Sequence, residues 1–194
     1  MLESARARKP RAVVCAASAG GFPTLLRILR ALPSLFQPPI VIVLHVSRAE
    51  PSALADVLRR ASKRSVKRAE HGETLEAGIV YVAPPNYHVV IRRNGTMALT
   101  HEPPEHHVRP AADPLFVSAA RAFKRNVIAI VLSGSGRDGA TGARAIHDAG
   151  GFVIVEDPSL AQFPSMPLAA IAAGAADEVL ASGEIAGALV QLAS

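Results

Sequence analysis

The stretch VVCAASAGGFPTLLRILRAL, residues 13–32, joins an apolar run to an amphipathic run through the short turn Ser18-Ala19-Gly20-Gly21. A nearly continuous apolar run is typical of a strand covered on both faces, and apolar residues three and four apart are typical of a helix. The same alternation recurs along the chain. The sequence therefore predicts an α/β fold, doubly wound, with a mainly parallel sheet, helices on both faces and a β-hairpin excursion.

The pattern places the elements as follows. The predicted strands are Ala12–Ala17, Ile40–Leu44, Ile79–Ala83, Val127–Leu132 and Phe152–Val155. The predicted helices are Thr24–Ala31, Ser52–Ala61, Pro114–Phe123, Thr141–Ala149, Pro167–Ala173 and Glu184–Leu192. Asn94-Gly95 predicts the turn of the hairpin, because both residues tolerate a positive φ. A Pro/His-rich loop, HEPPEHHVRP, follows it.

Length and composition limit the class of protein. A chain of 194 residues with 49% hydrophobic and 19% charged residues forms one globular domain, which we expect over residues 12–194 after a basic tail at residues 1–11. Despite a net charge of +5, aromatic residues make up only 4% and Trp is absent, so we expect no nucleic-acid partner. No segment is long and apolar enough to span a membrane or to act as a secretory signal. The single cysteine, Cys15, is predicted to be a buried hydrophobic residue, and the compartment is predicted to be the cytoplasm.

Three predicted strands are followed by residues with catalytic side chains: Ser18, His45 and Asp138. The carboxyl ends of parallel strands meet at one edge of a sheet, and these three groups together can activate a serine. Each also has a simpler explanation. Ser18 could cap the helix that begins near Phe22, Asp138 could cap the helix that begins near Ala140, and His45 could simply end its strand.

Gly20-Gly21 favours free backbone amides at a helix start, which could hold a phosphate or an oxyanion. Neither dinucleotide-binding nor P-loop spacing occurs in the chain, so phosphate binding is the weaker reading. The histidines and glutamates of HEPPEHHVRP lack regular ligand geometry, and we expect a loop beside the substrate groove and no metal. The basic stretch Leu58–Arg68 is predicted to be a solvated helix face and turn.

Four motifs occur in a fixed order: AASAGG, Leu44-His45, VRPAADPLFVSAA and GSGRDGA. With them the chain resembles the catalytic domain of CheB-type protein-glutamate methylesterases of bacterial chemotaxis, over about residues 12–192. Three positions depart from the family pattern: Ala16 replaces a glycine, His71 stands where an aspartate is frequent, and Ser135 stands where methionine is common. Members usually carry an N-terminal receiver domain, so the chain is either a stand-alone esterase or an excised catalytic domain.

The resemblance implies a role for each matching residue. Ser18 would be the nucleophile, His45 the general base and then acid, and Asp138 the group that orients His45. Amides near Ala19 in the Gly20-Gly21 turn, and the backbone at Ser135, would hold the oxyanion, and Arg109 would line the substrate groove. No metal or organic cofactor is implied.

The implied substrate is a methylated glutamate on the cytoplasmic helices of a chemoreceptor, and many members also deamidate glutamine. Two alternatives stay open: a non-catalytic α/β binding module that docks through its basic surface, and an esterase or deamidase of an unrelated substrate.

Overall fold

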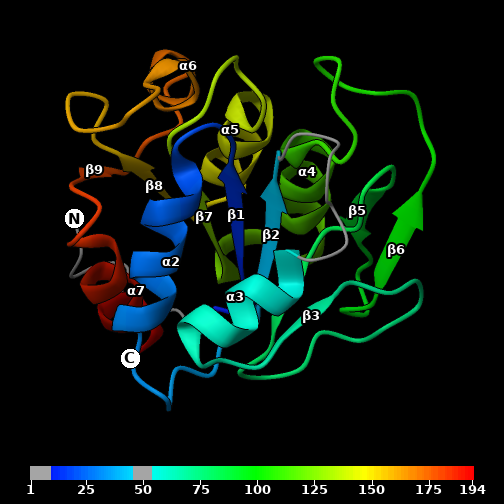
Figure 1. Cartoon of the computed structure of the whole chain (residues 1–194). Helices are drawn as coiled ribbons and strands as arrows, with labels where there is room; N and C mark the ends of the chain where they lie inside the picture. Colours follow the sequence, from blue (N-terminus) through cyan, green and yellow to red (C-terminus); the bar gives the residue numbers. More distant parts are fainter. Residues whose placement is uncertain (1–9, 46–53) are drawn as a thin grey trace.

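The structure is a computed structural model, and it describes residues 10–45 and 54–194. Seven parallel strands form the main sheet, in the order β3-β4-β2-β1-β7-β8-β9 (Figure 1). The strands are β1 (Ala12–Ala17), β2 (Ile40–Leu44), β3 (Val66–Arg68), β4 (Val80–Val82), β7 (Val127–Val131), β8 (Phe152–Glu156) and β9 (Glu178–Leu180). The predicted fold class is confirmed.

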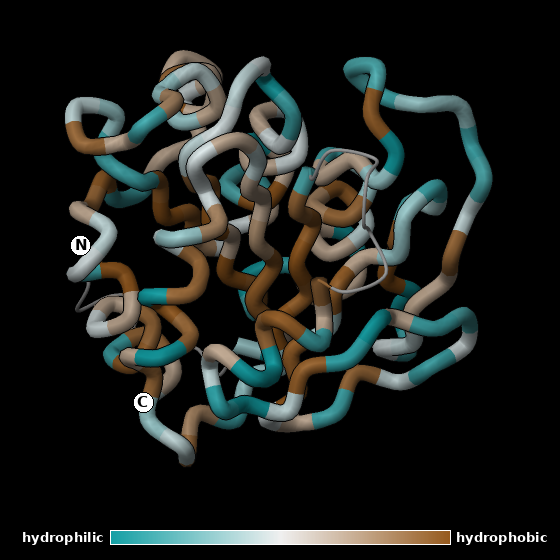
Figure 2. The backbone as a smooth tube through the Cα atoms, in the orientation of Figure 1, coloured by the Kyte–Doolittle hydropathy of each residue, from teal (hydrophilic) through white to brown (hydrophobic). Residues whose placement is uncertain are grey.

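Helices cover both faces of this sheet (Figure 1). They are α2 (Gly21–Ala31), α3 (Leu54–Ser62), α4 (Ala112–Phe123), α5 (Ala140–Asp148), α6 (Ser165–Ala172) and α7 (Ile185–Ala193), with a 3-10 turn η1 (Lys124–Asn126). Strand β1 shows why the fold needs both layers. Its six residues are all buried, and alternate ones belong to two separate hydrophobic cores. The central strands are accordingly the most hydrophobic part of the chain (Figure 2).

The two cores divide the helices between them. Val13, Cys15 and Ala17 face a core shared with α2, α3 and α7. Ala12, Val14 and Ala16 face a core shared with α4, α5 and α6. The second core also receives the hairpin of β5 (His88–Ile91) and β6 (Met97–Thr100), which is antiparallel and forms its own two-stranded sheet.

The hairpin turn differs from the two-residue turn that Asn94-Gly95 predicts. Gly95 alone of the pair has a positive φ, +86°. The Arg92 amide donates to the Thr96 carbonyl and the Gly95 amide to the Arg92 carbonyl, which leaves a three-residue loop. Asn94 accepts a hydrogen bond from the Thr96 amide instead, at 3.1 Å.

Two short edge strands were not predicted. β3 occupies the end of the stretch expected to be a helix face and turn, and β9 follows what looked like the last strand. Both contain three residues and are only partly buried, with one buried residue in β3 and none in β9, so neither carries the apolar run by which the other strands are recognised. The first two residues of the predicted Ser52–Ala61 helix, and residues 1–9 of the predicted tail, lie outside the described residues.

Candidate active site

The candidate site lies where the strand order changes direction. β1 pairs with β2 on one side and with β7 on the other, and a crevice forms beyond the carboxyl ends at such a point. The His45 amide donates to the Ala17 carbonyl at 3.0 Å, and the Ser18 amide donates to the Ser133 carbonyl at 3.0 Å. The segments after β1, β2 and β7 are therefore held side by side.

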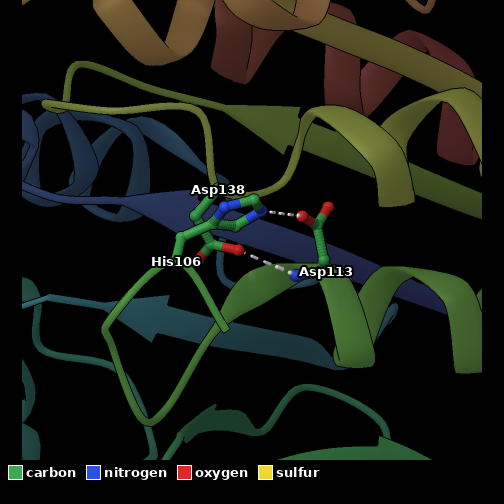
Figure 3. A group of neighbouring side chains, drawn as sticks. All are labelled: His106, Asp113 and Asp138. Atoms are coloured by element: carbon green, nitrogen blue, oxygen red, sulfur yellow. Dashed lines mark hydrogen bonds and ion pairs between the residues drawn. The ribbon is translucent and has the colours of Figure 1, made fainter. Parts of the chain in front are cut away.

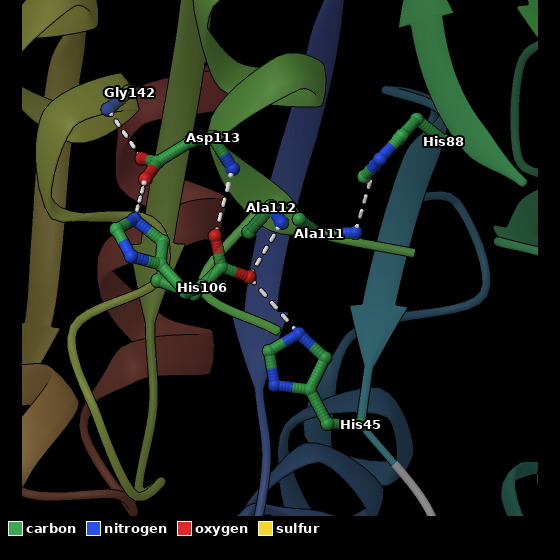
Figure 4. Close-up of polar contacts among 8 residues, drawn as sticks. His45, His88, His106, Ala111, Ala112, Asp113 and Gly142 are labelled. Atoms are coloured by element: carbon green, nitrogen blue, oxygen red, sulfur yellow. Dashed lines mark hydrogen bonds and ion pairs between the residues drawn. The ribbon is translucent and has the colours of Figure 1, made fainter. Parts of the chain in front are cut away.

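His45 and Asp138 meet at this edge (Figure 4). Nε2 of His45 lies 2.9 Å from Oδ2 of Asp138, and the side chains are 12% and 3% exposed. This is an ion-pair distance, although the geometry is not that of an aligned hydrogen bond and Nε2 has no hydrogen-bond partner among the described residues. Since Nε2 faces the carboxylate, Nδ1 is the ring nitrogen left for a second group.

Asp138 is held by backbone amides as well. Its two oxygens accept hydrogen bonds from the Ala112 amide at 2.6 Å and the Asp113 amide at 3.1 Å (Figure 4). Burial acts to raise the pKa of Asp138, but His45 and the two amides outweigh it and hold the pKa below its ordinary value. The carboxylate therefore stays ionised at neutral pH, as an orienting group for His45 requires. The alternative in which Asp138 caps α5 is wrong, because it caps the start of α4.

Ser18 leads a turn that brings backbones unusually close together. The residue that caps α2 is Gly20, in the left-handed region at φ +76° and with no side-chain cap bond, so Ser18 is not the helix cap. A β-carbon on Gly20 would lie 2.7 Å from Oε1 of Gln162, and one on Gly134 would lie 2.7 Å from Cβ of Ser18. Gly134 thus lets the loop after β7 approach the serine, and Gly20 makes room for Gln162 in the segment after β8.

The rest of the predicted oxyanion turn surrounds Ser18. The Gly21 amide, at the start of α2, donates to the Ser18 carbonyl at 2.9 Å, and the Ala19 carbonyl accepts a hydrogen bond from the Ser133 hydroxyl at 3.1 Å. Ser135 is exposed on the loop that follows β7.

Glu156 forms a buried hydrogen-bond hub under this turn, which was not predicted from the sequence. Glu156, only 2% exposed, accepts from the Ser133 amide at 2.7 Å and from the Thr24 hydroxyl at 2.9 Å. Ser133 in turn bonds the backbones of Ser18, Ala19 and Phe163. Glu156 directly follows the apolar run Phe152–Val155, so the strand-end criterion that found His45 would also have found it.

A second cluster that the sequence analysis missed contains His106, Asp113 and Asp138 (Figure 3). Their potential ligand atoms lie within 4.8 Å of one another, close enough for a metal ion. The carboxylates, however, already have partners in the protein. Asp113 accepts from the Gly142 amide at 2.7 Å and contacts Nε2 of His106 at 3.0 Å, while Asp138 is occupied as described above. Burial, and then the charge of Asp138, raise the pKa of Asp113 against the opposing Gly142 amide.

Arg109 lines the same pocket as His45, a hollow of about 550 Å³. Its guanidinium donates to Oδ1 of Asn86 at 2.8 Å and to the Glu102 carbonyl at 2.9 Å. The HEPPEHHVRP loop thus borders this pocket, and Arg109 holds that loop in place.

Comparison with known proteins identifies the family to which the chain belongs. The family model described as CheB methylesterase matches residues 13–189. A protein-glutamate methylesterase/protein-glutamine glutaminase of Anaeromyxobacter dehalogenans is 41% identical over 97% of the chain and 55% of its own length. One of Clostridium acetobutylicum is 38% identical over 93% of the chain and 52% of its own length, so the chain spans about half the length of these relatives.

A solved structure extends the likeness to three dimensions. The CheB methylesterase catalytic domain of Thermotoga maritima superimposes with a TM-score of 0.89 at 36% identity, over 94% of this chain and 98% of that one. Across the described ranges, every helix is too short or too polar to cross a membrane. Because the family model matches most of its length and a solved member shares its fold, the chain belongs to the CheB methylesterase family.

Proposed function

We propose that the chain is a cytoplasmic serine hydrolase that cleaves γ-methyl esters of glutamate side chains on the cytoplasmic helices of a chemoreceptor-like protein. The observation that carries the proposal is the His45–Asp138 contact at the same sheet edge as the Ser18 turn. The names of the similar proteins support the reaction and the class of substrate.

The reaction follows from the arrangement of these groups. Nδ1 of His45 takes the hydroxyl proton of Ser18 while Oγ attacks the ester carbonyl, and the negative charge on the carbonyl oxygen faces amides near Ala19 and Ser135. The C–O bond to the methoxy group breaks, and the imidazolium of His45 protonates the leaving group to give methanol. Water then attacks the acyl-enzyme with His45 again as base. The bond from the acyl carbon to Oγ of Ser18 breaks, the imidazolium of His45 returns a proton to Oγ, and the glutamate side chain is released. The ionised Asp138 stabilises the imidazolium throughout.

The same steps deamidate a glutamine side chain, with ammonia as the leaving group. Arg109 is proposed to contribute to substrate binding through the loop that it fixes at the rim of the pocket. The chemistry requires no metal or organic cofactor.

The decisive experiment is labelling with a fluorophosphonate, which reports an activated serine independently of the substrate. We expect one adduct, on Ser18, that is lost in Ser18→Ala and slowed by about 1,000-fold or more in His45→Ala. Ser34→Ala, which removes an exposed serine from the turn after α2, should label at the rate of the unmodified chain.

Labelling of the Ser18→Ala variant would overturn the assignment of Ser18 as the nucleophile. A folded chain that is never labelled would support the non-catalytic binding module. Methanol release from a methylated receptor then tests the substrate separately. Labelling at Ser18 without methanol release would indicate an esterase of another substrate.

A further inference from the structure

An open groove of about 780 Å³ lies between helix α4 and the β5–β6 hairpin. Three arginines line it: Arg92 and Arg93 from the hairpin turn, and Arg121 from α4. All three are exposed, and none has an ion pair or side-chain hydrogen bond within residues 10–45 and 54–194. We call this feature the arginine groove.

The walls of the arginine groove are fixed. The hydroxyl of Ser118 on α4 accepts a hydrogen bond from the Ile91 amide of β5 at 2.9 Å, which ties the hairpin to the helix. The floor between them is apolar, with half-buried side chains that remain open to a ligand: Val90, Pro114, Val117 and Ala122.

The electrostatic balance in the groove is positive. Glu105 and Asp113 are the acidic residues among its lining, and Asp113 is already paired with His106 and with the Gly142 amide. Burial, and then the nearby charge of Asp113, raise the pKa of Glu105, so the negative charge of Glu105 itself is disfavoured there. The excess positive charge therefore lies on the guanidiniums of Arg92, Arg93 and Arg121.

The groove is separate from the pocket of the candidate active site. One loop divides the two: Glu105 and His106 line the arginine groove, whereas Pro104 and His107 line the pocket that contains His45. A ligand in the groove would therefore lie across this loop from the reacting ester and would leave the pocket free.

We propose that the arginine groove binds an acidic peptide segment of a partner protein. Carboxylates of the segment would pair with Arg92, Arg93 and Arg121, and an apolar side chain between them would pack on Val117. Guanidiniums on two different elements, with an apolar floor between them, match an extended segment better than a small inorganic anion. The lining contains no Phe, Tyr or Trp on which bases could stack, so it does not match single-stranded nucleic acid.

The test uses a fluorescein-labelled decapeptide of paired glutamates and leucines, with fluorescence anisotropy as the measurement. We expect saturable binding that weakens with salt, and no binding of the corresponding lysine–leucine peptide. Arg92→Ser with Arg121→Ser should weaken binding by about tenfold or more. The matched control, Arg59→Ser with Arg60→Ser on the exposed face of α3, removes the same charge and should change the affinity by less than about twofold.

A third variant, Val117→Ser, tests the apolar floor without changing the charge of the groove, and it should also weaken binding. Thermal unfolding of each variant establishes that the fold is retained. Three results would each overturn the proposal: no saturable binding, an equal loss in the control pair, or equal competition by a single-stranded oligonucleotide. Fluorophosphonate labelling of Ser18 reports the proposed reaction separately, so failure of either proposal is distinguishable from failure of the other.

Discussion

The environment of each candidate residue decides whether it suits catalysis or only folding. Ser18 and Asp138 both stand directly before helices, where either could serve as an ordinary cap. The structure removes both explanations, since α2 and α5 are capped by glycines. Asp138 instead contacts His45 and two amides of α4, so one buried carboxylate both anchors a helix and contacts the histidine that it is proposed to orient.

For Glu156, an effect on the reactivity of Ser18 can be measured separately from an effect on the stability of the fold. Glu156 fixes Ser133, and Ser133 fixes the backbone of Ser18, so we assign Glu156 as a positioning residue for the proposed nucleophile. Glu156→Ala should slow fluorophosphonate labelling of Ser18 by about 10- to 100-fold, because small displacements of a nucleophile are costly. With substrate, kcat should fall while KM changes little.

Two further variants make this prediction specific. Glu156→Gln keeps one carbonyl acceptor and should recover most of the labelling rate. Thr24→Val removes the other donor to Glu156 but leaves the bond to Ser133, so it should lower stability without slowing the labelling. Labelling of Glu156→Ala at the unmodified rate would show that Glu156 has only a structural role.

At the scale of elements, α4 and α5 cap each other across the site. Asp138, which precedes α5, accepts from the first amides of α4, and Asp113 in the first turn of α4 accepts from the Gly142 amide of α5. A carboxylate at a helix start is favourable because it meets unpaired amides and the positive end of the helix dipole. Neither partner could be identified from sequence, because each acts on a helix other than the one it adjoins.

Asp138→Asn tests this capping through its dependence on pH. The pKa of Asp138 is depressed in the folded chain, so ionised Asp138 stabilises the fold above its unfolded pKa of about 3.9. That contribution is lost as the pH falls through the lower, folded pKa. At pH 7 the substitution should therefore lower the free energy of unfolding by about 1–3 kcal/mol, and the difference should shrink below about pH 4.

Urea unfolding at a series of pH values from 7 down to 3 measures this difference. Asp148→Asn is the matched control, since Asp148 is exposed and pairs with the exposed Arg144, and its effect should be small throughout. A stability difference for Asp138→Asn that stayed constant over the whole range would contradict the assignment of Asp138 as an ionised cap.

At the scale of the whole molecule, the sequence predicted the strands that are buried in the cores. It did not predict the short edge strands or the hydrogen bonds between residues far apart in the chain. The five predicted strands were recognisable because their residues are buried, even in β4, which has only three residues. The hydroxyl, imidazole and carboxylate after three of them could be read directly from the sequence. The edge strands β3 and β9 could not, since they are short and only partly buried. Nor could the Glu156 hub be assigned a partner, because Ser133 lies 23 positions away in the chain.

Cys15 reports on the integrity of the core that β1 shares with α2, α3 and α7. It lies in β1 at the centre of the sheet, with no exposed surface, and burial together with the charge of Glu156 raises the pKa of its thiol well above the ordinary value. Only the thiolate reacts with disulfide reagents, so the native chain should react at least about a thousandfold more slowly than the chain in urea.

The measurement is the rate of absorbance change with an aromatic disulfide, and the unfolded chain should show one thiol. Because β1 is shared by both cores, we expect the two layers to unfold together, and the native rate should then follow global unfolding as urea is added. Fast reaction of the folded chain would mean that one helical layer opens independently of the other.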